Sequence, residues 1–340
     1  MKKKLSIISN ESIYYENNKF FCDNIDMKSI PEGLSNFFNI NLITRKSKFE
    51  RSKEIHIEKI DIYSNFFLYI RQIVKSIKNS DTNILIISLT PYTFFASLIC
   101  IFLKKKFYLY IRSDGFLEYK KILGFIGPYI YSLMFSMISS KAKLITCHPK
   151  LLKEKKGTVL KPSQIDEKWL ASKKIADLKS VKLLYVGRIK IEKGINSLFE
   201  IIKKLSINFT LTIVGNEKKN DLKIINPNIK ILNSTKSKSL IEIYDDSNIF
   251  ILPSFTEGYS QVVDESLSRG RPVIVFKEIS DIVFENRKGV FVSNRDSASL
   301  EKTINHIMKN YESISDLISK NNLPTKKNFI KELSSTIMQD

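Results

Sequence analysis

Cysteine, histidine and tryptophan are scarce in this chain of 340 residues. It holds three cysteines, three histidines and one tryptophan, spaced like neither a disulfide framework nor a zinc site. We therefore expect no bound metal and a reducing environment. A secretory signal is also missing, because the apolar run after the first four residues is only five residues long, LSIIS. The sequence thus predicts a cytoplasmic protein.

A long uninterrupted apolar run is absent as well. The most apolar window, residues 83–103, approaches the roughly 20 residues that a membrane-spanning helix needs. Pro91 divides this window into two parts. We therefore expect a strand followed by a buried helix here, rather than a membrane span.

Basic residues, in contrast, are abundant, and the formal net charge is +20. Residues 104–156 contain twelve lysines and arginines and only three acidic residues. Such a field attracts anionic partners, which include nucleic acid, lipid head groups and phosphorylated substrates. A solvated, lysine-rich surface without a specific partner explains the same composition, so the charge alone does not decide between these interpretations.

Short apolar runs alternate with helical patterns along the chain, which predicts an α/β fold with parallel sheets. The expected strands are 4–9, 40–44, 55–60, 84–89, 107–111, 144–147, 158–160, 183–186, 211–214, 229–232, 249–252 and 272–275. The expected helices include 30–38, 66–77, 93–103, 194–205, 299–310 and 328–338. A polar connector, 161–180, separates two predicted domains, 1–160 and 161–324. Residues 325–340 form a closing helix that could pack back on the first domain.

The densest signals lie in residues 249–276, where a buried strand, a glycine turn, a short helix and a second strand follow one another. Pro253 closes the first strand, because proline cannot donate to a central ladder. Gly258 lies in the turn, where its backbone can take a positive φ or let a ligand approach closely. The helix would end at Gly270 and would point its unpaired N-terminal N–H groups at an anion such as phosphate.

Two cations occupy the loop between the expected strand 183–186 and the helix 194–205. Arg188 follows Gly187 directly, and Lys193 stands just before the helix. This arrangement suits a diphosphate, because arginine can bind oxygens with two N–H groups while lysine adds a point charge.

The second half of the chain resembles glycosyltransferase family 4, over residues 181–276. The similarity rests on Gly187-Arg188, Glu192-Lys193-Gly194, Pro253-Ser254, Glu257-Gly258-Tyr259 and Gly270-Arg271-Pro272-Val273, with Glu257 and Glu265 in the spacing Glu-x7-Glu. The first half matches only in its βα alternation. The resemblance implies a GT-B fold, in which two Rossmann-like domains face a cleft. It also implies retention at the anomeric carbon without a catalytic metal.

The resemblance further implies a role for each motif residue. Arg188 and Lys193, after Gly187, would bind the donor diphosphate and stabilise the leaving group. Glu257 would contact the sugar hydroxyls and Glu265 the ribose hydroxyls, with backbone N–H groups near Gly258, Tyr259 and Ser260 completing the donor site. Preorganised cations and helix N–H groups would then replace the metal that other sugar transferases need.

This sequence departs from the family pattern at several positions. Residues 10–26 lack the glycine pair that many members carry after the first strand, so no donor contact is assigned to that loop. Ser260 stands where glycine is common. Asp114 is the first candidate for a catalytic residue in the first domain, and His148 is the second. An aspartate in a turn also commonly caps backbone N–H groups.

Residues 120–143 form an aromatic, methionine-rich helical stretch flanked by lysines, and two interpretations are open. The stretch could lie in a membrane interface, with Phe125, Tyr129, Tyr131 and Phe135 at the head-group level. Alternatively, Ile130, Leu133, Met134 and Met137 could belong to the protein core.

The main hypothesis is therefore a metal-independent, retaining glycosyltransferase of the hexosyltransferase type. It would move a sugar from a nucleotide-sugar donor to a glycan or lipid-linked acceptor, in bacterial surface polysaccharide or lipooligosaccharide synthesis. We expect it to need no cofactor, to bind no nucleic acid, and to lie peripherally on the inner face of the cytoplasmic membrane. The alternatives are a basic nucleic-acid-binding protein and a GT-B nucleotide-sugar epimerase.

Overall fold

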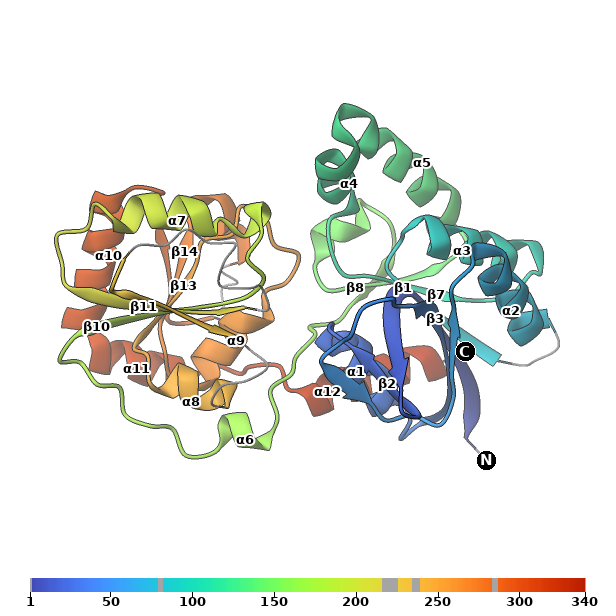
Figure 1. The fold of residues 1–340 in the computed structure, drawn as a ribbon, viewed down its shortest axis with the longest axis horizontal. Coiled ribbons are helices and arrows are strands. Elements are labelled where there is room, and N and C mark those ends of the chain that lie inside the picture. The colour runs from blue at the N-terminus through green and yellow to red at the C-terminus, as the bar shows by residue number, and fades with distance from the viewer. Residues whose placement is uncertain (1, 79–81, 216–225, 234–238, 283–286, 340) are drawn as a thin grey trace. The chain divides into compact units, whose positions relative to one another are not determined.

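The computed structural model describes residues 2–78, 82–215, 226–233, 239–282 and 287–339 (Figure 1). The chain divides into two compact units, each with its own sheet and apolar core. Unit 1 comprises Met1–Pro162 and Lys327–Asp340, and unit 2 comprises Ser163–Lys326. Both sheets are mainly parallel and are covered by helices, which confirms the predicted α/β class with two Rossmann-like domains.

Unit 1 contains a parallel sheet whose chain order reverses next to its first strand. Its parallel strands are β1 (Lys3–Glu16), β3 (Phe38–Lys46), β5 (Ile60–Tyr63), β6 (Thr82–Ile87), β7 (Tyr108–Ile111), β8 (Lys143–Thr146) and β9 (Gly157–Val159). They pair in the order β5-β3-β1-β6-β7-β8-β9. The chain proceeds outward from β1 in one direction and from β6 in the other, so the switch point lies between these two strands.

The segment after Ser9 is a β-hairpin, which corrects the loop expected at residues 10–26. β1 continues to Glu16 and turns back into the antiparallel strand β2 (Lys19–Cys22), which in turn pairs with β4 (Lys53–Ile55). Asn17 and Asn18 form the turn with φ of 49° and 59°. Asparagine tolerates this left-handed conformation, and two such residues match the twist of a tight hairpin.

Several other element boundaries differ from those expected. The strand expected at 55–60 is wrong, because β4 ends at Ile55 and β5 begins at Ile60. The helix expected at 30–38 begins earlier, as α1 (Ile25–Leu34), because Asn24 caps it by accepting a hydrogen bond from the N–H of Asp26. The remaining helices of the first half are α2 (Phe66–Lys78), α3 (Pro91–Phe102), α4 (Gly115–Leu123) and α5 (Gly127–Ser139).

The apolar helical stretch Gly115–Ser139 is folded back on itself. Among the described residues, Gly115–Ser139 is the one helical stretch long and apolar enough to cross a membrane, by length and composition only. It is broken at Gly124, with φ of 66°, and the 3₁₀ turn η1 (Gly124–Ile126) leads into α5. α4 and α5 then pack on each other, with the ring centroids of Phe116 and Tyr131 4.8 Å apart. The structure therefore shows a helical hairpin here.

The residues named in the two interpretations of this hairpin differ in their exposure, and contact with a membrane stays a prediction. Phe125, Tyr129 and Leu133 are 81%, 74% and 63% exposed, and Ile130 and Met137 are also exposed. Tyr131, Met134 and Phe135 are buried. Tyr131 and Phe135 thus hold the hairpin together instead of lying at head-group level, whereas Ile130, Leu133 and Met137 are outside the core.

The last helix, α12 (Lys326–Met338), packs in the core of unit 1. Phe329, Ile330, Leu333 and Ile337 are buried in the same apolar cluster as residues of β1 and β3. The ring of Phe329 lies 6.3 Å from that of Tyr110 on β7. Unit 1 is therefore built from two separate stretches of the sequence.

Unit 2 contains six parallel strands in the order β12-β11-β10-β13-β14-β15. The strands are β10 (Val181–Val186), β11 (Phe209–Gly215), β12 (Ile229–Asn233), β13 (Ile249–Leu252), β14 (Val273–Phe276) and β15 (Val290–Ser293). The helices are α6 (Glu167–Leu170), α7 (Ile195–Ile202), α8 (Leu240–Asp245), α9 (Gln261–Ser268), α10 (Ser297–Lys309) and α11 (Tyr311–Ser319). In Figure 1, α7 lies on one side of this sheet and α9 and α11 on the other. The switch point of unit 2 lies between β10 and β13.

Replacing Leu333 of α12 by alanine should destabilise unit 1 by about 2–5 kcal/mol, because a fully buried leucine leaves a cavity. Lys331→Ala, at an exposed position of the same helix, is the control and should cost less than about 0.5 kcal/mol. Urea denaturation followed by far-UV circular dichroism measures both. Fluorescence of Trp169, the only tryptophan, follows unit 2 separately. Equal stabilities for the two variants would contradict the packing of α12.

Candidate functional site

The loops after β10 and β13 contain most of the predicted site residues. Residues 187–194 lead from β10 to α7, and residues 253–260 lead from β13 to α9. These two strands flank the switch point of unit 2, and in open parallel sheets the switch point leaves a crevice at the carboxyl ends of the strands. The fold therefore brings both groups of residues to the edge where ligands bind in this class of protein.

Three contacts fasten the two loops to each other. The backbone N–H of Phe255 donates to the carbonyl oxygen of Glu192 at 3.0 Å. The Lys193 ammonium lies 2.7 Å from Oε1 of Glu257. Gly194 takes φ of 68°, and a Cβ there would come within 1.9 Å of the carbonyl oxygen of Pro253. Both the conformation and the lack of space require glycine at position 194.

The carboxylate of Glu257 is anchored through one oxygen. Oε1 accepts hydrogen bonds from Lys193 and, at 2.6 Å, from the Ser254 hydroxyl. The side chains of Lys193 and Glu257 are only 19% and 9% exposed. Shielding from solvent makes this charge pair stronger than one on an open surface. The pair neutralises itself, and an entering anion would compete with Glu257 for the ammonium.

Arg188 has a fixed backbone and an exposed side chain. Its carbonyl oxygen accepts a hydrogen bond from the Tyr185 hydroxyl at 2.8 Å, and a Cβ on Gly187 would lie 2.7 Å from that hydroxyl. Among the described residues, no carboxylate pairs with the Arg188 guanidinium. The exposed guanidinium can therefore offer N–H donors to an anionic ligand.

Glu265 lies inside α9 and is buried. Its Oε2 accepts a hydrogen bond from the Tyr244 hydroxyl at 3.1 Å. Burial, together with the negative charge of Glu265, raises the pKa of Tyr244 well above its usual value. Tyr244 therefore keeps its proton and acts as a donor to the carboxylate.

Gly258, Tyr259 and Ser260 lie between Glu257 and the start of α9. Gly258 lies in the turn between β13 and α9, two residues before the N-cap residue Ser260. The Tyr259 hydroxyl donates to Oδ2 of Asp264 at 2.6 Å, and the Arg287 guanidinium lies 4.7 Å from the centre of its ring. Ser260 is the N-cap residue of α9, yet its hydroxyl does not cap the helix. The first N–H groups of α9 are therefore not covered by that side chain.

Arg295 contacts the loop after β13 and was not among the residues predicted from the sequence. Its guanidinium forms a two-point ion pair with Glu278, at 2.6 and 3.1 Å, and also donates to the carbonyl oxygen of Ser254 at 3.3 Å. It lies between the rings of Phe255 and Phe276, 4.1 and 4.5 Å from their centres. Arg295 follows β15, so the rule that ligands collect at strand ends could have identified it if β15 had been predicted.

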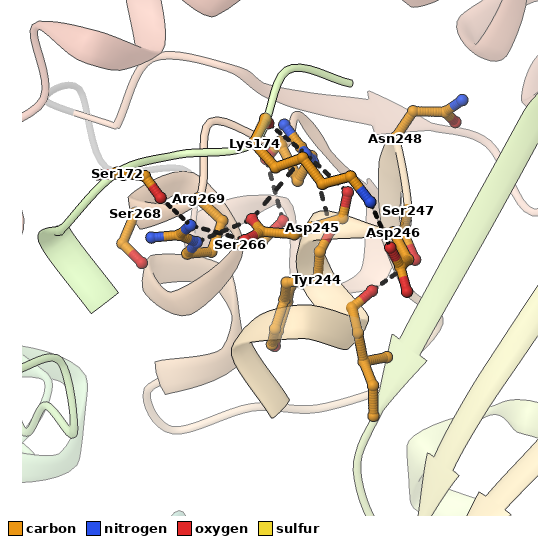
Figure 2. A network of polar contacts seen from close by, with 12 residues as sticks. Ser172, Lys174, Tyr244, Asp245, Asp246, Ser247, Asn248, Ser266, Ser268 and Arg269 are labelled. Carbon is orange, nitrogen blue, oxygen red and sulfur yellow. Dashed lines mark hydrogen bonds and ion pairs between the residues drawn. The ribbon is translucent and has the colours of Figure 1, made fainter. Parts of the chain in front are cut away.

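Two buried arginines, Arg269 and Arg271, join the end of α9 to α8 and to the connector, and Figure 2 shows Arg269 beside Asp245 and Ser172. Arg269 is only 1% exposed and uses all five of its N–H donors. Its partners are both carboxylate oxygens of Asp245, at 2.9 and 2.7 Å, and the carbonyl oxygens of Trp169, Ala171 and Ser172. Residues 169–172 are thus fixed to unit 2, although they lie in the stretch 161–180 that was predicted to be a polar connector.

Arg271 adds a second set of bonds to the same region. Its Nε donates to the carbonyl oxygen of Tyr244 at 3.2 Å. Its Nη2 donates to the carbonyl oxygens of Lys174 and Asp245 at 2.7 and 2.9 Å. The two arginines together hold the C-terminal end of α8 in place.

Unit 1 has a cavity of about 340 Å³ at the carboxyl ends of β6 and β7, beside Asn10 in the middle of β1. Its polar lining comes from Asn10, Ser88, Thr90, Arg112, Ser113 and Glu118. Its apolar lining includes Leu89, Pro91, Ile111, Tyr119, Ile122, Leu123 and Tyr131. Ile122 and Leu123 are exposed and also belong to the α4–α5 hairpin, so the cavity wall continues into that apolar surface.

Asp114 and His148, the candidates in the first half, both cap helical turns. Asp114 accepts hydrogen bonds from the backbone N–H groups of Phe116 and Leu117, and its carboxylate lies 3.6 Å from the Lys153 ammonium. Nδ1 of His148 accepts from the N–H of Lys150 at 3.1 Å. Both residues belong to unit 1, whereas the other predicted site residues belong to unit 2. The catalytic role of Asp114 stays a prediction.

The cysteines have structural positions. All three, Cys22, Cys100 and Cys147, are free and buried, and burial raises the pKa of each thiol to about 12. They are therefore protonated and unreactive near neutral pH. In the described part of the chain, no three His, Cys, Asp or Glu side chains gather in a group that could hold a metal ion.

The sequence of this chain is similar to those of known glycosyltransferases. Residues 167–323 match the family described as Glycosyl transferases group 1. The capsular polysaccharide biosynthesis glycosyltransferase CapM of Staphylococcus aureus is 29% identical over 242 residues, which are 64% of this chain and 60% of CapM. The chain thus spans less than two thirds of the curated relatives it matches. The family match covers almost the whole of unit 2.

Solved structures show the same fold over the full chain. WaaG, a glycosyltransferase involved in lipopolysaccharide biosynthesis, superposes with a TM-score of 0.69 at 13% identity, covering 99% of this chain and all of that one. HepE of Anabaena in complex with UDP-glucose superposes with a TM-score of 0.66 at 11% identity, covering 98% of each chain. The architecture is therefore that of the GT-B glycosyltransferases.

Gly194→Ala should destabilise the protein more than Gly270→Ala. Both glycines have φ near 70°, so both substitutions meet a conformational cost of about 1–2 kcal/mol. Only at Gly194 does the new Cβ also collide with a backbone oxygen, because a Cβ on Gly270 would have no atom closer than 3.7 Å. Thermal unfolding of the two variants measures the difference. Equal losses would contradict the close contact between the two loops.

Proposed function

We propose that this protein is a retaining, metal-independent glycosyltransferase that takes a sugar from a nucleotide-sugar donor. The observation that carries the proposal is the pair of fastened loops at the switch point of unit 2, with Arg188, Lys193 and Glu257 on them. The family match of residues 167–323 supports the transferase class. The UDP-glucose bound to HepE, a protein of the same fold, supports a nucleotide-sugar as donor.

The donor diphosphate would bind where the two loops meet. Arg188 can offer several N–H groups to its oxygens, and Lys193 can leave Glu257 for a phosphate. The uncapped start of α9 adds backbone N–H groups near the same loop. As the sugar–phosphate bond breaks, negative charge grows on the diphosphate. Preorganised cations then stabilise the transition state more than the ground state.

The two glutamates would hold the other parts of the donor. Once Lys193 turns to the diphosphate, Glu257 keeps its bond from Ser254 and can accept hydrogen bonds from the sugar hydroxyls. Glu265 would accept from the ribose hydroxyls. Residues 231–245, together with the first domain, would determine which sugar, base and acceptor are bound, and they lie partly outside the described residues. Tyr244 and α8 belong to their described part.

The acceptor would be a glycan or lipid-linked sugar at the cytoplasmic face of the membrane, in capsule-type or lipopolysaccharide-type synthesis. The names of CapM and WaaG support this class of pathway. The exposed apolar residues of the α4–α5 hairpin, next to Lys120 and Lys121, form a surface that suits peripheral contact with anionic lipid. The cavity of unit 1 borders that surface and would receive the acceptor.

Glu265→Ala should raise the donor KM about tenfold and change kcat little, because a ribose contact is equally strong in the ground and transition states. Glu257→Ala should lower kcat as well, since contacts with the reacting sugar strengthen during transfer. Steady-state kinetics separate the two effects. The donor is found by screening UDP-, GDP-, ADP-, dTDP- and CMP-sugars for thermal stabilisation. Stabilisation by none of them would contradict the proposal, and an isomerised nucleotide-sugar as product would indicate an epimerase.

Membrane contact can be tested with vesicles of phosphatidylglycerol and phosphatidylcholine. Leu133→Asp in α5 should reduce co-sedimentation several-fold, because it puts a charge into the apolar surface. Ile175→Asp, at a 91% exposed position of unit 2, is the matched control and should bind like wild type. Raising the salt concentration should weaken binding of all three proteins. Wild-type protein that stays in the supernatant, or equal loss in both variants, would contradict membrane contact.

A further inference from the structure

The carboxylate of Glu257 already binds the ammonium of Lys193, which is one of the two cations proposed to bind the donor diphosphate. Its Oε1 lies 2.7 Å from that ammonium, and the backbone bond from Phe255 to Glu192 joins the two loops that carry the pair. Among the residues that the structure describes, no second carboxylate forms an ion pair with Lys193. Glu257 is therefore a tethered competitor of any anion that binds this lysine.

Breaking this ion pair has a cost that depends on what replaces it. Both side chains are partly shielded from solvent, Glu257 more than Lys193. When Lys193 turns to a phosphate, the cation gains a new partner, whereas Glu257 keeps only one of its two described partners, the Ser254 hydroxyl. A shielded carboxylate without its cation is unfavourable, and the phosphate adds a second negative charge nearby. A bare diphosphate binds against this cost.

The sugar of an intact donor would offset the same cost. Lys193 and the Ser254 hydroxyl both bind Oε1 of Glu257, so the departure of Lys193 frees an acceptor position on that same oxygen. A sugar hydroxyl can donate there, and hydrogen bonds to a charged acceptor are roughly twice as strong as neutral ones. Diphosphate and sugar then favour each other's binding, because each supplies a partner to one half of the separated pair.

We propose that Glu257 is a specificity-determining residue, which makes the site prefer the intact nucleotide-sugar to the free nucleoside diphosphate. The inference rests on the proposed function, because it assumes that the diphosphate binds Lys193 and that the sugar contacts Glu257. It goes further in assigning Glu257 a second role, in the release of the spent nucleotide. Once the sugar has been transferred, the carboxylate loses its hydroxyl partner and takes back the Lys193 ammonium.

The test is the affinity of Glu257→Gln for inorganic pyrophosphate and for UDP, GDP and ADP, by isothermal titration calorimetry without acceptor. Glutamine keeps the size of the side chain and an acceptor for Ser254, but it removes the charge that competes for Lys193. The variant should bind pyrophosphate and the preferred nucleotide about 5–20-fold more tightly than wild type. The corresponding nucleotide-sugar should show no such gain. A merely structural defect would weaken every ligand.

The melting temperature gives a second readout for the same variant. Without ligand, Glu257→Gln should melt below wild type, because a partly shielded lysine is left without its counter-charge. Saturating pyrophosphate should raise its melting temperature more than that of wild type, because tighter binding stabilises the folded state more.

Glu192→Gln is the matched control. It removes one negative charge from the same loop, but Glu192 is not the described ion-pair partner of Lys193. It should change pyrophosphate affinity less than about twofold. In a Lys193→Ala background, Glu257→Gln should likewise bring less than about a twofold gain, because the group for which the carboxylate competes is gone.

The outcomes separate the inference from the proposed function. If wild type binds neither pyrophosphate nor any of the three nucleotides, the donor site itself is refuted. If wild type binds them and Glu257→Gln binds them no more tightly, only the specificity role is refuted. The same holds if Glu192→Gln tightens binding equally, or if the nucleotide-sugar gains as much affinity as the free nucleotide.

Discussion

The geometry of unit 2 depends on the burial of Arg269. Removing a guanidinium from water costs several kcal/mol, and this cost is offset only when each donor has a partner. Asp245 and three carbonyl oxygens of residues 169–172 meet that condition completely. Since those groups belong to α8 and to the connector, neither can shift without leaving a buried donor unpaired. These hydrogen bonds hold the end of α8, which includes Tyr244, in place.

Charged side chains are also paired at the proposed donor site. Arg188, Lys193 and Arg295 would bring three positive charges to adjacent loops, yet two of them are balanced by Glu257 and Glu278. The three cations and two carboxylates have a formal sum of +1, and more positive charge becomes available when a ligand displaces a carboxylate. Fastening by backbone contacts, as between Phe255 and Glu192, keeps the loops together while the side chains exchange partners.

Local sequence signals predicted much of the fold and of the candidate site. The strand ends, the αL glycine at 270 and the loop with Arg188 and Lys193 follow from short-range chemistry. Arg269 and Arg295 were not predicted, because their partners lie up to 100 residues away and a lone arginine in sequence suggests an exposed position. The hairpin at Asn17-Asn18 was missed because asparagine is a weaker turn signal than glycine.

The placement of α12 has a consequence for synthesis of the chain. Unit 2 is a continuous segment, whereas the core of unit 1 needs Phe329 and Leu333, which are made after all of unit 2. On the ribosome, unit 2 can therefore complete its fold first, although unit 1 emerges earlier. Until α12 arrives, the apolar residues of β1 and β3 that it covers are open to solvent. A chaperone would be most needed during synthesis, before α12 has been made.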